Sequence, residues 1–227
     1  MARIEHRFVR GISAKHEVQY EVRGPKGNLL HHTLPLTQSV ISSECGILCT
    51  LMAAMILLGL PRPQVEALAT TRRGSLKRLW AIAKAHYFEG ASVEDIQRYI
   101  RAFSPELTSM PAIGSPAQIG RSVAVAIDDD AVSLLLIEAR SWVHWTICIA
   151  VEIDADTERP LALLCIDPAA AAPWAMPFSA RLELNSRLRS VNGKKSAHPL
   201  IYRYVMNGDR CAVRLLSAVI VSRAQPP

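Results

Sequence analysis

The sequence is short of the features that mark several large classes of protein. Glycine and proline together make up 25 of the 227 residues, which excludes collagen-like and low-complexity chains. Half of the residues are apolar and one fifth are charged, so the composition is not that of a disordered protein. The five cysteines are an odd number in a chain of this length, which favours reduced thiols over a disulfide framework.

The sequence also lacks an apolar run that would cross a bilayer comfortably. The longest run, 46–61, is better explained as a buried helix, and the charged N-terminus MARIEHRFVRG is not a signal peptide. We therefore expect a cytoplasmic protein with no membrane span, and export without a cleaved signal stays open. No P-loop or dinucleotide-binding glycine pattern is present, and no cofactor is expected.

Positive charge is concentrated near the C-terminal end of the chain. The net charge is +6, and residues 181–214 hold eight of the 26 basic residues but two of the 20 acidic ones. Such a region can favour nucleic acid or an acidic partner. No nucleic-acid-binding motif accompanies it, so a solvated basic face is the favoured interpretation and no nucleic acid is expected as a partner.

The order of the expected elements predicts an α+β fold in one domain that spans 1–227. The N-terminal residues 1–37 are expected to form short strands, including 16–22 and 29–36. Helices are expected at 45–58, 64–70, 76–87, 93–103 and 116–127, which gives a helical lobe over about 38–127. Strands are expected at 132–138, 143–153, 161–166, 201–205 and 212–221, which gives a β lobe over about 131–222.

Cys45 begins the apolar helix expected over 45–58. Ser42 and Ser43 are candidate N-caps, and Gly59 is placed to end the helix. Free backbone N–H groups and the helix dipole stabilise an anion at a helix start, which favours the thiolate of Cys45. On its position alone, Cys45 is equally well explained as a buried, inert cysteine. Cys49, one turn further along, is expected to be inert.

A thiolate nucleophile needs a base, and the base needs a group that orients it. His144 lies in one predicted strand, and Asp167 directly follows the next one. In a hairpin that pairs Cys148 with Leu163, His144 lies opposite Asp167 on the same face of the sheet. A shift of one residue would place the two side chains on opposite faces.

Gln38 stands seven residues before Cys45, in the loop that leads into the helix. Its side-chain amide could stabilise an oxyanion together with the backbone N–H of Cys45. Three tryptophans flank the proposed site. They are expected either to pack in the core or to form a wall that screens the ion pair or grips the substrate. These are Trp142, Trp145 and Trp174.

Two stretches of the chain resemble a known family. Residues 38–59 are similar to the start of bacteriocin-processing cysteine peptidase domains, which are papain-like domains that remove double-glycine leader peptides. The matching positions are Glu44, Cys45, Gly46, Cys49, Met52 and Gly59. Residues 144–147 and 166–169 resemble the His-aromatic strand and the Asp-Pro turn of the same family.

The resemblance implies a papain-like fold, in which a helical lobe with a central helix that begins at the cysteine packs against an antiparallel sheet. It implies a catalytic triad of Cys45, His144 and Asp167, with Gln38 at the oxyanion. Trp142, Trp145 and Gly46 are then expected to contact the substrate. The chain departs from the family in two respects: the spacing from Gln38 to Cys45 is one residue longer, and the membrane helices and nucleotide-binding domain of the exporter-fused members are missing.

Three functions are compatible with these residues. The first is a cysteine peptidase that acts on a peptide or protein, and the second is an acyltransferase or amidase that uses the same triad. The third is an inactive papain-like domain that binds a peptide. A metal site at Cys45, Cys49 and His144 is a weaker alternative, because Cys-x3-Cys at a helix start is atypical of structural zinc. The sequence predicts neither the cleavage preference nor the oligomeric state.

Overall fold

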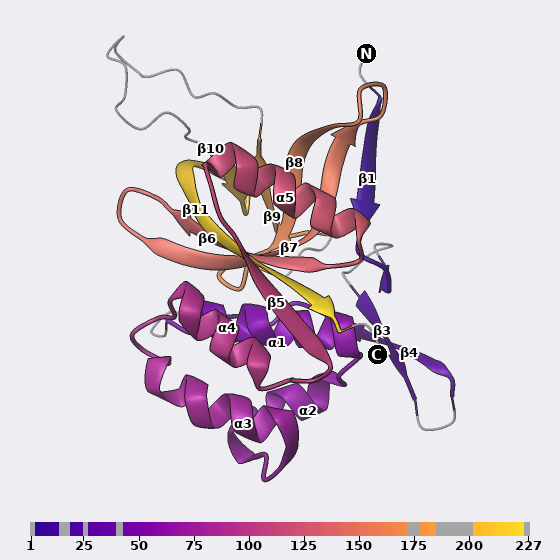
Figure 1. Ribbon diagram of the computed structural model, residues 1–227, viewed down its shortest axis with the longest axis vertical. Coiled ribbons are helices and arrows are strands. Elements are labelled where there is room, and N and C mark those ends of the chain that lie inside the picture. The colour runs from indigo at the N-terminus through magenta and orange to yellow at the C-terminus, as the bar shows by residue number, and fades with distance from the viewer. Residues whose placement is uncertain are drawn as a thin grey trace.

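A computed structural model of the chain describes residues 3–13, 19–24, 27–39, 43–171, 178–184 and 202–224. Helices α1 to α4 gather on one side of a β-barrel, and α5 lies along the barrel itself (Figure 1). The helices are α1 (Cys45–Leu58), α2 (Arg62–Glu66), α3 (Gly74–Ala83), α4 (Val93–Arg101) and α5 (Pro116–Asp128), with short 3-10 helices η1 (Leu68–Thr70) and η2 (Lys84–His86).

Six antiparallel strands close into the barrel. They are β6 (Val132–Glu138), β7 (Val143–Asp154), β8 (Arg159–Ile166), β9 (Ala180–Glu183), β10 (Tyr202–Met206) and β11 (Asp209–Arg223). Their order is β7, β6, β11, β10, β9, β8, and direct pairing of β7 with β8 closes the ring. Two further strands extend the sheet, β1 (Ile4–Phe8) along β7 and β5 (Leu107–Ala112) along β11. A separate sheet contains β2 (Ile12–Ser13), β3 (Gln19–Arg23) and β4 (Leu29–Thr33).

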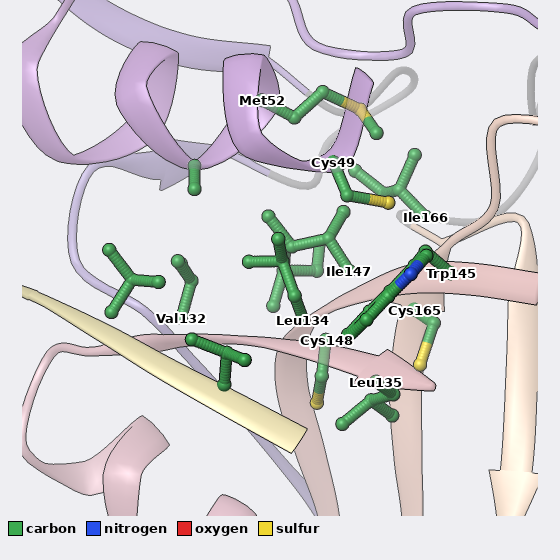
Figure 2. Packing of buried hydrophobic residues seen from close by; sticks show 14 of the residues in the cluster. Cys49, Met52, Val132, Leu134, Leu135, Trp145, Ile147, Cys148, Cys165 and Ile166 are labelled. Carbon is green, nitrogen blue, oxygen red and sulfur yellow. The ribbon is translucent and has the colours of Figure 1, made fainter. Parts of the chain in front are cut away.

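Helix α1 is the central helix of the fold, and 12 of its 14 residues are buried. A helix that is apolar on every side must be packed from several directions. Figure 2 shows apolar side chains filling the space between α1 and the strands, with Cys49 near Ile147 and Ile166. Gly59 ends the helix in the left-handed conformation, with a φ of 65°. This packing places the first residue of α1, Cys45, beside the start of β7.

The serine N-cap predicted for this helix was wrong. Glu44 occupies the N-cap position of α1, and no side-chain hydrogen bond caps the first turn. The backbone N–H of Ser43 instead donates to the carbonyl of Tyr87 at 3.1 Å. Ser42 lies outside the described residues. The first turn of α1 therefore keeps its N–H groups unclaimed by a capping side chain.

A capping box begins α4. The Asp95 N–H donates to the Ser92 hydroxyl at 3.2 Å, and the Ser92 N–H donates to the Asp95 carboxylate at 3.0 Å. Ile96, Ile100 and Phe103 are buried. The box fixes the start of α4 next to α1.

Two strands were missed in the sequence. Strand β5 lies inside the range predicted to be the helical lobe, and its polar residues and Pro111 do not form a strand pattern. Proline is tolerated there because β5 pairs with β11 on one side only. Strand β9 is only four residues long and lies in a stretch for which no element was predicted. The other predicted strands and helices are present, except that 64–70 is divided into α2 and η1 and 76–87 into α3 and η2. Residues 16–18 and 201 of the predicted strands lie outside the described residues.

The register predicted for the β7–β8 hairpin was also wrong. Cys148 lies opposite Cys165 rather than Leu163, because the turn places Asp154 opposite Arg159. At the end of the hairpin near His144 the error is two residues, an even number, whereas a bulge changes the offset to three over 150–152. Since side chains alternate between the two faces of a strand, a shift of two leaves His144 and Asp167 on the same face, as predicted.

Some predicted features lie outside the described residues, namely Trp174 and the 185–201 portion of the basic stretch. All five cysteines are free thiols. Within the described ranges, no helix combines the length and the apolar character needed to cross a membrane.

Candidate active site

The structure brings together the three side chains of the predicted triad. Cys45 is the first residue of α1, His144 is the second residue of β7, and Asp167 directly follows β8. The His144 Nε2 atom lies 2.7 Å from Asp167 Oδ1. The Cys45 side chain is also a hydrogen-bond partner of the His144 imidazole. With Nε2 engaged by Asp167, the remaining ring nitrogen, Nδ1, is the one available to the thiol.

Asp167 is 2% exposed, and hydrogen bonds hold it on all sides. Its Oδ1 atom accepts from the Ala169 N–H at 2.8 Å as well as from His144. Its Oδ2 atom accepts from the Tyr204 hydroxyl at 2.5 Å. The backbone N–H of Asp167 donates to the Ser179 hydroxyl at 2.8 Å. A buried carboxyl group with this many hydrogen bonds is fixed in orientation.

His144 is held as a cation by its neighbours. Burial lowers the pKa of His144, but the hydrogen bonds and charges of Asp167 and Cys45 outweigh it and raise the pKa to about 10. The imidazolium therefore persists at neutral pH. A cation beside a cysteine favours its thiolate, so the arrangement suits a thiolate–imidazolium pair.

Gln38 lies on the wall of the same pocket as Cys45 and His144. Its backbone N–H donates to the carbonyl of Pro168 at 2.8 Å, which ties the loop before α1 to the turn that carries the triad carboxylate. The long spacing between Gln38 and Cys45 thus still brings the amide-bearing residue to the pocket.

Glu44 fixes the rest of this loop, a role that was not predicted from the sequence. Its carboxylate accepts from the Ser39 N–H at 2.9 Å. A hydrogen bond from the Tyr87 hydroxyl to Glu44 raises the pKa of Tyr87. Glu44 is 7% exposed, and these two donors compensate its buried charge beside Cys45.

A pocket of about 540 Å³ opens beside the triad. This volume lies in the range of small-molecule and peptide side-chain sites. The segment between η2 and α4 forms one wall, and the barrel forms the other. Besides Gln38, Cys45 and His144, the lining residues are Ser43, His86, Glu89, Gly90, Ala91, Ser92, Asp95, Leu136, Val143 and Trp145.

The two described tryptophans near the site occupy different environments. Trp145 is 2% exposed, and its indole Nε1–H donates to the carbonyl of Ala91 at 2.8 Å. It supports the pocket wall from behind and offers little surface to a substrate. Trp142 is 37% exposed, and its ring is perpendicular to the His144 imidazole with 6.1 Å between centroids. Trp142 is thus exposed beside His144, but it is not one of the residues that line the pocket.

Gly46 joins α1 to the pocket wall by close packing. A Cβ atom at this position would lie 2.9 Å from Ile96 Cδ1 and 3.0 Å from Ala91 Cβ. The residue is buried. Gly46 is thus needed for the approach of the two elements that carry Cys45 and the wall, rather than for direct contact with a ligand.

The metal alternative finds no support among the described residues. They contain no group of three or more histidine, cysteine or acidic side chains arranged to hold a metal ion. Burial raises the pKa of Cys49 well above its usual value, so this side chain stays a thiol.

The sequence predicted no role in the site for Tyr204, which donates to Asp167. The alternation of the strand around Tyr202 and Tyr204 places both rings on one buried face. That pattern predicts a polar hydroxyl inside the sheet, and a buried hydroxyl needs a partner. The identity of the partner, Asp167, follows only from the pairing of β10 with β9 and of β9 with β8.

No model of a known protein family matches this chain, and no curated protein sequence is significantly similar to it. The resemblance of the two short stretches to the bacteriocin-processing peptidases therefore stays a prediction. The candidate site is supported by its own geometry.

Proposed function

We propose that this protein is a papain-like thiol hydrolase, most specifically a cysteine peptidase that cleaves an amide bond of a peptide or protein. The observation that carries the proposal is the hydrogen-bonded series from Cys45 through His144 to Asp167 at the edge of a pocket. A nucleophile, a base and an orienting carboxylate in this sequence are the requirements of nucleophilic acyl transfer.

In the first half of the reaction, the Cys45 thiolate attacks the carbonyl carbon of the scissile amide. The carbonyl oxygen becomes an oxyanion, which the Gln38 amide and the Cys45 backbone N–H stabilise. The His144 imidazolium gives its proton to the amide nitrogen, the C–N bond breaks, and an amine leaves. The product is a thioester between Cys45 and the acyl part of the substrate.

In the second half, neutral His144 takes a proton from water as the water oxygen attacks the thioester. The C–S bond breaks, a carboxylic acid is released, and the thiolate–imidazolium pair is restored. Asp167 keeps the Nε2 side of the ring occupied throughout, so that Nδ1 faces the reacting atoms.

An amidase or acyltransferase would use the same first half and differ in the acyl donor or in the group that accepts the acyl unit. A peptide library separates the candidates. A peptidase yields new amine and carboxylate ends in water, whereas a transferase yields an acylated acceptor only when an amine or alcohol is supplied. A Cys45→Ala variant should give neither product.

The primary test is the pH dependence of iodoacetamide alkylation, located by peptide mass spectrometry, in the parent and in His144→Ala. Cys45 should be alkylated rapidly well below pH 8, and the substitution should slow this by about tenfold or more. Cys211 is the internal reference, because burial raises its pKa. If Cys45 reacts no faster than glutathione and is indifferent to His144, the proposal fails.

A further inference from the structure

Both carboxyl oxygens of Asp167 are hydrogen-bonded to a side chain, and the triad accounts for the contact with only one of them. Oδ1 faces His144, while Oδ2 accepts a 2.5 Å hydrogen bond from the Tyr204 hydroxyl. Tyr204 is 1% exposed and lies in β10. A buried tyrosine that donates to a buried carboxylate is a charge-assisted hydrogen bond, which is stronger than one between neutral groups.

The contact crosses the inside of the barrel. Tyr204 lies opposite Leu182 of β9, which in turn lies opposite Leu163 of β8. Strand β9 therefore separates Tyr204 from the strand that leads to Asp167, so the hydroxyl reaches the carboxylate through the barrel interior and not along a ladder. The contact depends on the pairing of β10 with β9 and of β9 with β8, which brings two distant parts of the chain two strands apart.

The surroundings leave the tyrosine as a neutral donor and His144 as the cation. The titratable groups that interact with Asp167 come from five elements: His144 of β7, Tyr204 of β10, Cys165 of β8, Cys211 of β11 and Cys49 of α1. Burial raises the pKa of Tyr204 and of the three thiols, so all four stay protonated at neutral pH.

We infer that Tyr204 is a positioning residue, whose hydroxyl holds Oδ2 of Asp167 and so keeps Oδ1 aimed at His144. The inference rests on the proposed function, since it assigns Tyr204 a place behind the same triad. Without the hydroxyl, Oδ2 would lose the side-chain donor that fixes it. A carboxylate that is less well fixed holds the His144 imidazolium less well, and with it the Cys45 thiolate that the imidazolium supports.

The test is Tyr204→Phe, with Tyr202→Phe as the matched control. Tyr202 lies two residues away on the same buried face of β10, so its variant removes a hydroxyl from the same strand without touching Asp167. The measurement is the rate of Cys45 alkylation by iodoacetamide against pH. In Tyr204→Phe the acid limb should move to higher pH by about one unit, and the rate at pH 6 should fall about tenfold. Tyr202→Phe should match the parent.

Repeating Tyr204→Phe in an Asp167→Asn background shows whether the hydroxyl acts through the carboxylate. The expected result is no further shift, because the group that Tyr204 stabilises is gone. An equal shift in both backgrounds, or a Tyr204→Phe profile that coincides with the control, would overturn the inference. Thermal unfolding of each variant confirms that the folded protein is being compared.

Nitrogen NMR of the His144 imidazole separates this inference from the proposed function. The imidazolium should lose its proton at lower pH in Tyr204→Phe than in the parent, whether or not Cys45 is a nucleophile, because the hydrogen bond from Asp167 that raises the pKa of His144 is weakened. If this titration moves and Cys45 is unreactive in the parent, the proposed function fails and the role of Tyr204 stands. If Cys45 is reactive and neither the titration nor the acid limb moves, the role of Tyr204 fails alone.

Discussion

Glu44 and Asp167 are two buried carboxyl groups of the site, and only Asp167 is hydrogen-bonded to the histidine. Glu44 accepts from the Ser39 N–H and from Tyr87, so its charge is directed into the loop before α1. Asp167 accepts from His144. Both charges are compensated locally, which limits their repulsion of a thiolate. Glu44 thus fixes the loop that carries Gln38, and Asp167 fixes the His144 base.

Gln38→Ala should separate oxyanion stabilisation from thiolate formation. Amide hydrolysis passes through an oxyanion, and removal of one donor typically lowers kcat by about 10²- to 10³-fold. Alkylation by iodoacetamide forms no oxyanion, so the Cys45 alkylation rate should stay within about twofold of the parent. Both rates are measured on the same preparation. A parallel loss of both rates would show that Gln38 supports the site structurally, and an unchanged kcat would remove it from the oxyanion site.

At the scale of helices and strands, the sequence predicts the site better than it predicts the pairing that builds it. The helix that begins at Cys45 has the observed bounds, because an apolar stretch with a glycine stop leaves few alternatives. The β7–β8 register was two residues off, and His144 and Asp167 still share a face because the strand period is two. Chemical type and position at element ends therefore identified the triad.

What the sequence could not predict depends on pairing between distant strands. Strand β5 contains Pro111 and shows no strand pattern, and only its pairing with β11 defines it as a strand. Tyr204 is 37 residues from Asp167, and its contact depends on the pairing of β10, β9 and β8. No local pattern encodes this pairing, since the periodicity of each strand is satisfied equally well by other strand orders.

Gly46→Ala tests the contact between α1 and the pocket wall. The added Cβ would lie 3.0 Å from the Ala91 Cβ, which cannot rotate away, so the helix start must shift. We expect a loss of about 1–3 kcal/mol in the free energy of unfolding, together with slower alkylation of Cys45. Chemical denaturation and mass spectrometry measure the two effects.

Gly120→Ala is the control for this substitution. Gly120 lies within α5, and a Cβ there meets only the flexible end of Leu184, at 3.1 Å. Alanine is the better helix former by about 1 kcal/mol, so this variant should be as stable as the parent or more stable. If Gly46→Ala is no less stable than Gly120→Ala, the close approach at the start of α1 is not required.

On the scale of the whole molecule, the site lies where the helices meet the barrel. The loop before α1, the start of α1, the start of β7 and the end of β8 each contribute one side chain, and β10 adds another through the barrel interior. Strand β5 ties the two regions together, since it pairs with β11 while α4 packs beside it. A substitution in the site should therefore change the free energy of unfolding of the entire fold.

Because of His144, the free energy of unfolding should decrease as the pH rises. The pKa of this group is about 10 in the folded protein against 6.5 without the protein environment. Below pH 6.5 His144 is protonated in both the folded and the unfolded protein, and its stabilising contribution is fully present. Between pH 6.5 and 10 only the folded state keeps it, so the free energy of unfolding falls by up to about 1.4 kcal/mol per pH unit from this group.

Comparison of Cys45→Ala with Cys45→Ala/His144→Gln isolates this effect, because in the parent the thiol would release a proton as the imidazole takes one up. The difference in free energy of unfolding between the two variants, measured by urea denaturation, should shrink as the pH rises above about 6.5. A difference that stays constant with pH would mean that the folded protein does not hold the imidazolium, and the thiolate of Cys45 would lose its proposed support.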